Sequence, residues 1–100
     1  MFFVVSQTWP LSSNEEIGRV SVEMLIDPWP DYMERVILLL SPGGEGAKSI
    51  AVYKVEDGKD AEAYQKMVER FLKFSVVPGY KITIEPYLTV KQGLSIVGLY

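Results

Sequence analysis

Dense apolar runs and helical stripes of apolar residues follow one another along this chain of 100 residues. Residues 1–8 are rich in β-branched and aromatic side chains and end at Trp9 and a proline, which predicts a first strand. A helix is expected next, because serines precede glutamates at capping-box spacing and apolar positions then recur every three or four residues. Pro28 closes this helix and opens an irregular connection.

The middle of the chain predicts a β-hairpin. The apolar run at 36–40 is too short for a helix and indicates a buried strand from about residue 32 to 41. Residues 48–55 predict a second strand, with Ile50 and Val52 on one side and Ala51, Tyr53 and Val55 on the other. The glycine-rich segment 42–46 resembles a phosphate-binding loop only superficially, because Ala47 interrupts the required Gly-Lys-Ser sequence and a strand follows. We therefore expect a hairpin turn there.

The last third of the chain predicts a helix, a strand and an apolar tail. Asp57 or Asp60 is the expected N-cap of the helix, and Arg70 belongs to the side chains expected to face water. Residues 80–85 alternate between apolar and polar side chains, which indicates a fourth strand. The apolar tail at 89–100 is interpreted as an extra strand or an arm.

This β-α-β-β-α-β order predicts one α+β domain over residues 1–100, of the ferredoxin-like type, with both helices on one face of a four-stranded antiparallel sheet. The strands carry large apolar side chains on both faces, so several hundred Å² would stay exposed on the other face. Covering that area is worth on the order of 10 kcal/mol before association costs. We therefore expect a homodimer packed sheet to sheet, with the tail either paired on its own sheet or exchanged with the partner.

Composition excludes several classes of chemistry. The chain contains no cysteine and no histidine, which removes disulfides, thiolate nucleophiles, imidazole bases and the usual zinc and haem sites. We expect no metal and no cofactor. A net charge of −3 without a basic cluster argues against nucleic acid as a partner. The longest apolar runs are far too short to span a bilayer, and no secretory signal is readable, so a cytoplasmic location is the default expectation.

Aromatic residues in the connections are candidate ligand-binding groups. Trp9 precedes the first helix, and Trp29 and Tyr32 lie in the proline-rich connection after it. Such side chains can rim a pocket and stack on an apolar or aromatic ligand. The competing interpretation is that they fill the two ends of the helix layer.

Polar side chains within apolar strands are the second set of candidates. Glu85, beside Tyr87, is the candidate acid–base group, because desolvation favours the protonated form of a partly buried carboxylate. Arg35 or Lys54 could clamp an anion, and Tyr53 is a further catalytic candidate. The alternative is that these side chains form cross-strand ion pairs at a sheet edge or dimer rim.

The order of elements, the length and the two-sided apolar sheet resemble the dimeric α+β barrel superfamily. Its members include cofactor-free antibiotic-biosynthesis monooxygenases, muconolactone isomerase, YciI-like proteins, and haem-degrading or chlorite-splitting enzymes. The resemblance covers almost the whole chain but rests on topology, and it implies a pocket between sheet and helices or at the barrel rim. The haem and YciI-like chemistries need histidine and do not carry over. The Asn–Trp pairing of the monooxygenases has no match, since Asn14 is the only asparagine and lies at a helix start.

Three functions follow from this sequence. The first is a dimeric binding or accessory module for a small apolar or aromatic ligand, because no nucleophile–base couple or cofactor motif is visible. The second is a cofactor-independent monooxygenase or isomerase acting on an aromatic substrate. The third is an interaction protein that docks through residues 94–100 as an added strand. A cavity lined by Tyr53 or Glu85 together with a tryptophan would favour the enzyme.

Overall fold

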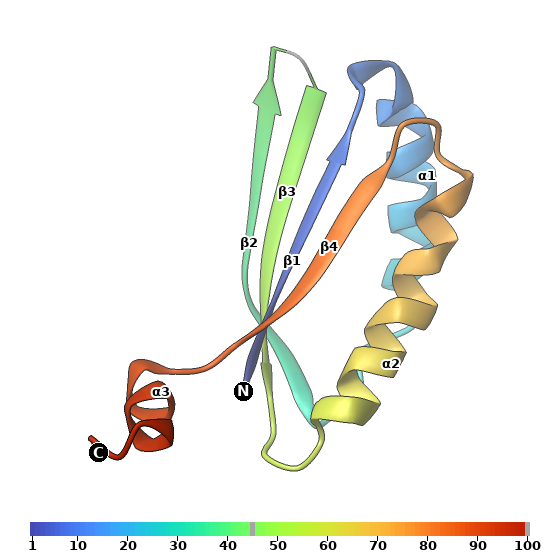
Figure 1. Cartoon of the computed structure of the whole chain (residues 1–100). Coiled ribbons are helices and arrows are strands. Elements are labelled where there is room, and N and C mark those ends of the chain that lie inside the picture. The colour runs from blue at the N-terminus through green and yellow to red at the C-terminus, as the bar shows by residue number, and fades with distance from the viewer. Residues whose placement is uncertain (45, 100) are drawn as a thin grey trace.

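A computed structural model describes residues 1–44 and 46–99. Strands in it run antiparallel, in the order β2-β3-β1-β4 across a single open sheet, and α1 and α2 cover one face of that sheet (Figure 1). The α+β class and the four antiparallel strands confirm that part of the prediction. The elements in chain order are β1 (Phe2–Trp9), the 3-10 helix η1 (Leu11–Ser13), α1 (Asn14–Leu25), β2 (Met33–Gly43), β3 (Gly46–Val55), α2 (Asp60–Phe71), the 3-10 helix η2 (Leu72–Val76), β4 (Lys81–Tyr87) and α3 (Val90–Ile96).

The core lies between the sheet and the helices. On the central strand β1, alternate side chains point toward the helices, and Phe3, Val5 and Trp9 are buried there. Their neighbours across the ladder with β3 include Tyr53 and Ala51, which are buried on the same face. This period-two burial is what a sheet covered on one side requires. Alternate side chains of each strand are therefore buried under the helices, and the side chains between them lie on the uncovered face of the sheet.

The helix starts differ from the predicted caps. Ser13 precedes α1 but makes no side-chain cap; its hydroxyl donates to the carbonyl oxygen of Pro78 over 2.7 Å, because the start of α1 packs against the loop before β4. Lys59, and neither Asp57 nor Asp60, is the N-cap of α2. Asp60 falls inside the first turn, where a carboxylate is still favoured by the helix dipole.

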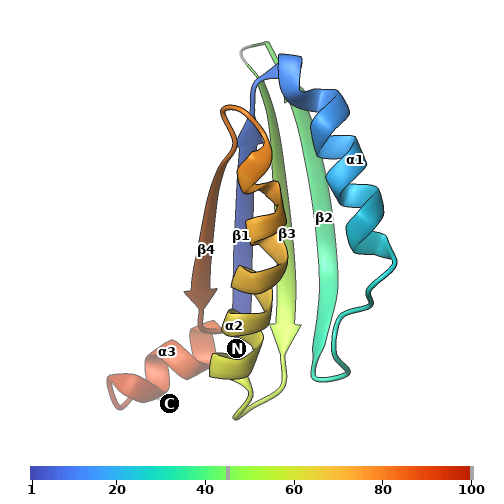
Figure 2. The ribbon, with the colours of Figure 1, turned by 90° about the vertical axis from the view of Figure 1, so that its right-hand side faces the viewer.

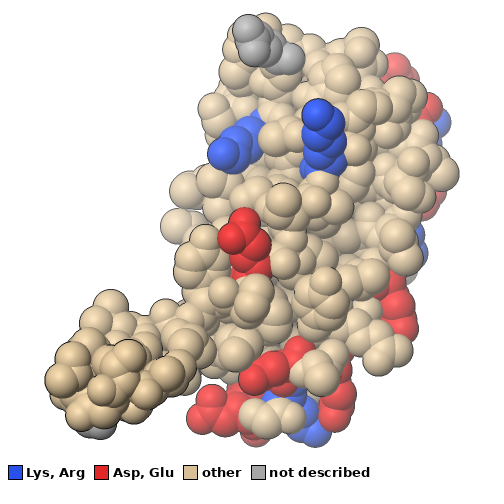
Figure 3. Space-filling model, viewed as in Figure 1, with Lys and Arg blue, Asp and Glu red and all other residues tan. Residues whose placement is uncertain are grey.

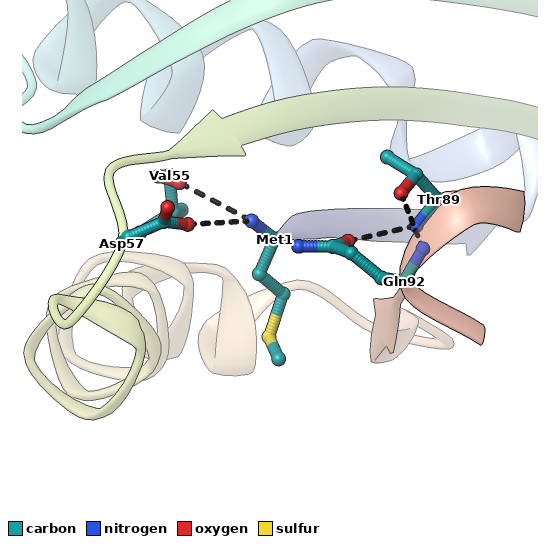
Figure 4. A network of polar contacts seen from close by, with 5 residues as sticks. All are labelled: Met1, Val55, Asp57, Thr89 and Gln92. Atoms are coloured by element: carbon teal, nitrogen blue, oxygen red, sulfur yellow. Dashed lines mark hydrogen bonds and ion pairs between the residues drawn. The ribbon is translucent and has the colours of Figure 1, made fainter. Parts of the chain in front are cut away.

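The prediction of an extra C-terminal strand was wrong, because residues of the tail form helix α3. Thr89 and Gln92 make a reciprocal capping box (Figure 4). The backbone N–H of Gln92 donates to the Thr89 hydroxyl, and the backbone N–H of Thr89 donates to the side-chain oxygen of Gln92. This Thr-x-x-Gln spacing is a helix-start signal that competes with the apolar run behind it. Residue 100 of the predicted tail lies outside the described residues.

Helix α3 stands apart from the domain as an arm (Figures 1 and 2). The Cα radius of gyration is 15.2 Å, whereas a compact domain of this length has about 13 Å. None of the α3 residues is buried. Nearby, the N-terminal ammonium of Met1 lies 3.4 Å from the Val55 carbonyl oxygen and 3.9 Å from the Asp57 carboxylate, which ties β1 to the end of β3 (Figure 4).

The hairpin between β2 and β3 is longer than predicted. The strands continue to Gly43 and restart at Gly46, so only the tip of the predicted 42–46 turn remains as a turn. Residue 45 lies outside the described residues. β2 is an edge strand, and ten of its eleven residues are exposed, which leaves a long apolar edge next to α1.

The face of the sheet away from the helices is open and largely apolar at its centre. The strand registers place Ile37 and Leu39 of β2 beside Val52 and Ile50 of β3, with Val4 of β1 next in the row. No described element covers these side chains, and Ile37 and Leu39 are 43% and 55% exposed. In Figure 3, which is viewed as in Figure 1, uncharged atoms cover most of the surface and several charged side chains gather at its lower end. We call the face of the sheet away from α1 and α2 the open face.

Candidate functional site

A cavity of about 370 Å³ lies between the helix-covered face of the sheet and the two helices. In Figure 2, α1 lies along the β2 edge and α2 lies in front of β1 and β3, and residues of both helices line the cavity together with β1, β2 and β3. Small side chains leave the space unfilled there: Ser49 and Ala51 of β3 and Ser21 of α1 all line it. The cavity opens toward solvent beside exposed Leu25 and Leu40.

A β-bulge in β2 determines which side chains enter the cavity. Arg35 is opposite Tyr53 of β3, but the next matched pair is Ile37 with Val52, so one extra residue interrupts the ladder. After this shift, Leu38 and Leu40 are opposite Ala51 and Ser49 and share their face. The bulge therefore brings a guanidinium and two leucines to the same cavity wall. A regular strand would have sent those leucines to the open face.

Tyr53 marks the polar end of the cavity. It is 3% exposed, and burial raises the pKa of its phenol. The charge of Arg35 and a hydrogen bond with it oppose that rise, as do the charge of Arg70 and a hydrogen bond with Trp29. The phenol oxygen thus lies among hydrogen-bond donors and cationic groups.

Arg70 holds the wall that contains Trp29. Its guanidinium is buried, lies 3.1 Å from the Asp27 carboxylate and donates to the Pro28 carbonyl oxygen over 2.9 Å. The same guanidinium lies 4.0 Å from the centre of the Trp29 ring. Trp29 in turn contacts the Tyr53 ring edge-on, at 5.1 Å between ring centres. The connection after α1 is therefore fixed to α2 by one side chain.

Trp9 closes the other end of the cavity. Its indole N–H donates to the side-chain oxygen of Asn14 over 2.7 Å, which orients the ring at the start of α1. Gln7 also lines the cavity and donates to the Tyr80 hydroxyl over 2.6 Å. Burial raises the pKa of Tyr80 to about 12, although its hydrogen bond with Gln7 opposes the rise. The aromatic ends of the cavity are thus held in place by hydrogen bonds within the chain.

The structure brings together some of the predicted site residues and separates the others. Trp9, Trp29, Arg35 and Tyr53 all line the cavity. The predicted residues outside it are Tyr32, Lys54, Glu85 and Tyr87.

The separation follows from strand alternation. Lys54 is the neighbour of Tyr53 along β3, so its side chain points to the open face, where it is exposed. Glu85 is opposite Val4 on that same face, and the Tyr87 hydroxyl reaches its carboxylate over 3.5 Å with both residues exposed. Tyr32 lies beneath the Lys59 ammonium, at 5.8 Å from the ring centre. The proposed acid–base pair thus shares no cavity with the aromatic candidates.

Arg70 is the site residue that the sequence analysis missed. It was expected to face water, yet it is only 5% exposed. Its spacing gave a usable signal, because Ala63, Met67, Arg70 and Phe74 follow one another at intervals of four, three and four residues and are all buried. A charged residue on the apolar stripe of a helix indicates a partner for its charge, here the Asp27 carboxylate.

The lining limits the chemistry of the cavity. Among the described residues that line it, none is an aspartate, a glutamate or a lysine. Arginine does not deprotonate in proteins, and a tyrosine with a raised pKa stays protonated at neutral pH, so neither can take a proton from a substrate. In the described part of the chain, no group of three or more acidic side chains gathers as a metal site. The arrangement suits binding and orientation better than proton transfer.

Comparisons with known proteins assign no family. No protein-family model and no curated protein matches this sequence. Among solved structures, the chain is similar to a de novo designed protein, Foldit4, with a TM-score of 0.49 and 8% identity over 88% of this chain and 100% of that one. A likeness at this level carries no argument about function. Within residues 1–44 and 46–99, no helix is both long and apolar enough to cross a membrane.

Proposed function

We propose that this protein is a small binding or accessory module that takes up an apolar or aromatic ligand in the cavity between α1, β2 and β3. The observation that carries the proposal is a cavity of about 370 Å³ with an apolar wall, two tryptophans and a few convergent polar groups. Ligand sites commonly have this character, and a volume near the lower end of their range suits a ligand of one or two rings.

A cofactor-independent monooxygenase or isomerase has less support than a binding module. Tyr53 and both tryptophans do line one cavity, as such an enzyme would require. However, Glu85 lies on the opposite face of the sheet, so the cavity lacks the carboxylate that would take a proton from a substrate. A binding module does not need Glu85 in the cavity, and we therefore favour the binding function.

Binding of a neutral fluorophore tests this function. We expect 1-aminonaphthalene, a neutral two-ring fluorophore, to bind wild-type protein saturably, with one site per chain. Ser21→Phe fills the cavity from α1 and is expected to weaken binding at least tenfold, because a ring occupies the ligand's space. Ser12→Phe, on the exposed surface of η1, is the matched control and should bind as wild type does. Equal binding by Ser21→Phe and Ser12→Phe would place the fluorophore elsewhere and refute the proposal.

We also propose that the module is a homodimer whose two open faces pack together, in a ferredoxin-like arrangement akin to the dimeric α+β barrels. The strand order β2-β3-β1-β4 and the open apolar face support this. The charges on that face support a second copy as the partner: Lys48 and Lys81 flank Thr8 at one end, while at the other end Glu85 and Glu34 outnumber Lys54. A two-fold axis perpendicular to the strands would bring the lysine end of one copy over the acidic end of its partner.

The arm α3 completes the proposed dimer. Val90, Ile96 and Leu99 are 80%, 74% and 73% exposed, and the arm projects on the open-face side of the sheet, away from α1 and α2 (Figure 1). A short helix with so much exposed apolar surface gains little stability in water on its own. We expect it to pack against the partner copy, which corresponds to one of the two arrangements of the tail that the sequence left open.

A further inference from the structure

The cavity has an electrically uncompensated polar end. Arg70 is paired with Asp27, but no described carboxylate lies within ion-pair distance of Arg35. The polar group opposite Arg35 across the β2–β3 ladder is Tyr53, whose pKa the Arg35 charge lowers against the effect of burial. The described lining therefore contains two guanidinium groups and no acidic group, whereas the rest of the wall is mostly apolar. An anion is the complementary group for this end.

The geometry also indicates how an anion would enter. Arg35 is exposed on the edge strand β2, so its guanidinium lies at the mouth of the cavity rather than at its base. Tyr53 is buried directly beside it, because the two residues form a matched pair across β2 and β3. A charged group can thus reach Arg35 without leaving water completely. An apolar body attached to it would extend along Leu38 toward Trp9.

We infer that the ligand is a small carboxylic acid, bound as its anion, with an apolar body of one or two rings. This inference rests on the binding function proposed above and names its ligand class. The carboxylate accepts hydrogen bonds from the Arg35 guanidinium and the Tyr53 hydroxyl, and the body fills the space between Trp9 and Trp29. Arg70 does not contact the ligand's carboxylate, because Asp27 and the Pro28 carbonyl already occupy its guanidinium. Its role is to hold Trp29 in place.

Two isosteric probes separate this inference from the binding function. Naphthylacetic acid and naphthylacetamide have the same body and nearly the same shape, and only the acid is charged at neutral pH. We expect both probes to quench tryptophan fluorescence when they bind. The dissociation constant of the acid should be at least tenfold lower than that of the amide, because a charge-assisted hydrogen bond contributes that much affinity. Equal affinities would overturn the carboxylate inference and leave the binding function standing. Failure of both probes and of the neutral fluorophore would overturn both.

Substitutions locate the preference on Arg35. In Arg35→Gln the acid should bind no more tightly than the amide, while the affinity for the amide stays within about twofold of wild type, because only the charged contact is removed. Arg35→Lys keeps the charge and should retain part of the preference. Arg19→Gln removes an exposed charge from α1 outside the cavity and serves as the control. An acid preference that persists unchanged in Arg35→Gln would refute the assignment.

Discussion

Replacing Arg70 by alanine should destabilise the domain strongly, although the residue carries a charge and lies on a helix. The substitution removes the hydrogen bond to the Pro28 carbonyl, worth about 1.5–3 kcal/mol for a charged donor. It also removes the contact with the Trp29 ring, worth about 1 kcal/mol. The ion pair with Asp27 adds at most about 1 kcal/mol, because the Asp27 side chain is 65% exposed and its charge is screened by solvent. We expect a total loss near 3 kcal/mol.

The assay is urea and thermal unfolding followed by circular dichroism. For a domain of this size, a loss of about 3 kcal/mol lowers the melting temperature by roughly 12–24 °C. Arg19→Ala is the control, because its only described ion pair, with Glu16, is exposed and spans 4.0 Å. Asp27→Ala should cost less than about 1 kcal/mol, since the Pro28 and Trp29 contacts remain. A loss below about 1 kcal/mol for Arg70→Ala would refute the role given to this side chain.

Three further predictions concern pH, the open face and the arm. Unfolded tyrosine ionises near pH 10, whereas burial raises the pKa of Tyr80 to about 12, so its contribution is complete below about pH 10 and is lost as the pH rises toward 12. The free energy of unfolding, obtained from urea midpoints, should therefore fall by roughly 2 kcal/mol between about pH 9 and 11.5 in the wild-type protein. The fall should be smaller in Tyr80→Phe, and an equal fall in the wild type and the variant would contradict this. Leu39→Glu should convert a dimer to a monomer in light scattering, whereas Val22→Glu, on exposed α1, should not; a dimeric Leu39→Glu protein would argue against the open face as the interface. Deleting residues 89–100 should leave the circular dichroism of the remaining elements intact and weaken dimerisation at least tenfold, and an unchanged dimer would show that α3 packs elsewhere.

Period-two and period-four patterns predicted most of the fold because they report burial directly. Residues 1–8 are rich in strand-forming side chains and residues 48–55 alternate, and both segments form strands in which buried residues alternate with less buried ones over most of their length. The tail was misassigned because a short apolar run does not distinguish strand from helix. There the local cap favours the helix, because Thr89 and Gln92 satisfy each other's backbone amides.

The candidate site was harder to predict because it depends on distances across the fold. Trp9, Trp29, Arg35 and Tyr53 could be singled out by residue type, but their meeting depends on the bulge that shifts the register of β2. No propensity scale places a bulge at one residue of an apolar strand. Glu85 was selected for its chemistry alone, and strand alternation put it on the other face.

The most direct test of the binding site is an NMR titration of isotopically labelled protein with naphthylacetic acid. Trp9 and Trp29 line the cavity and their indole N–H groups give resolved signals, so both signals should shift with one common dissociation constant. The amides of Lys48 and Lys81, on the open face, should not follow that titration. Saturable shifts confined to the open face or to α3, with both indole signals unmoved, would contradict the proposed site.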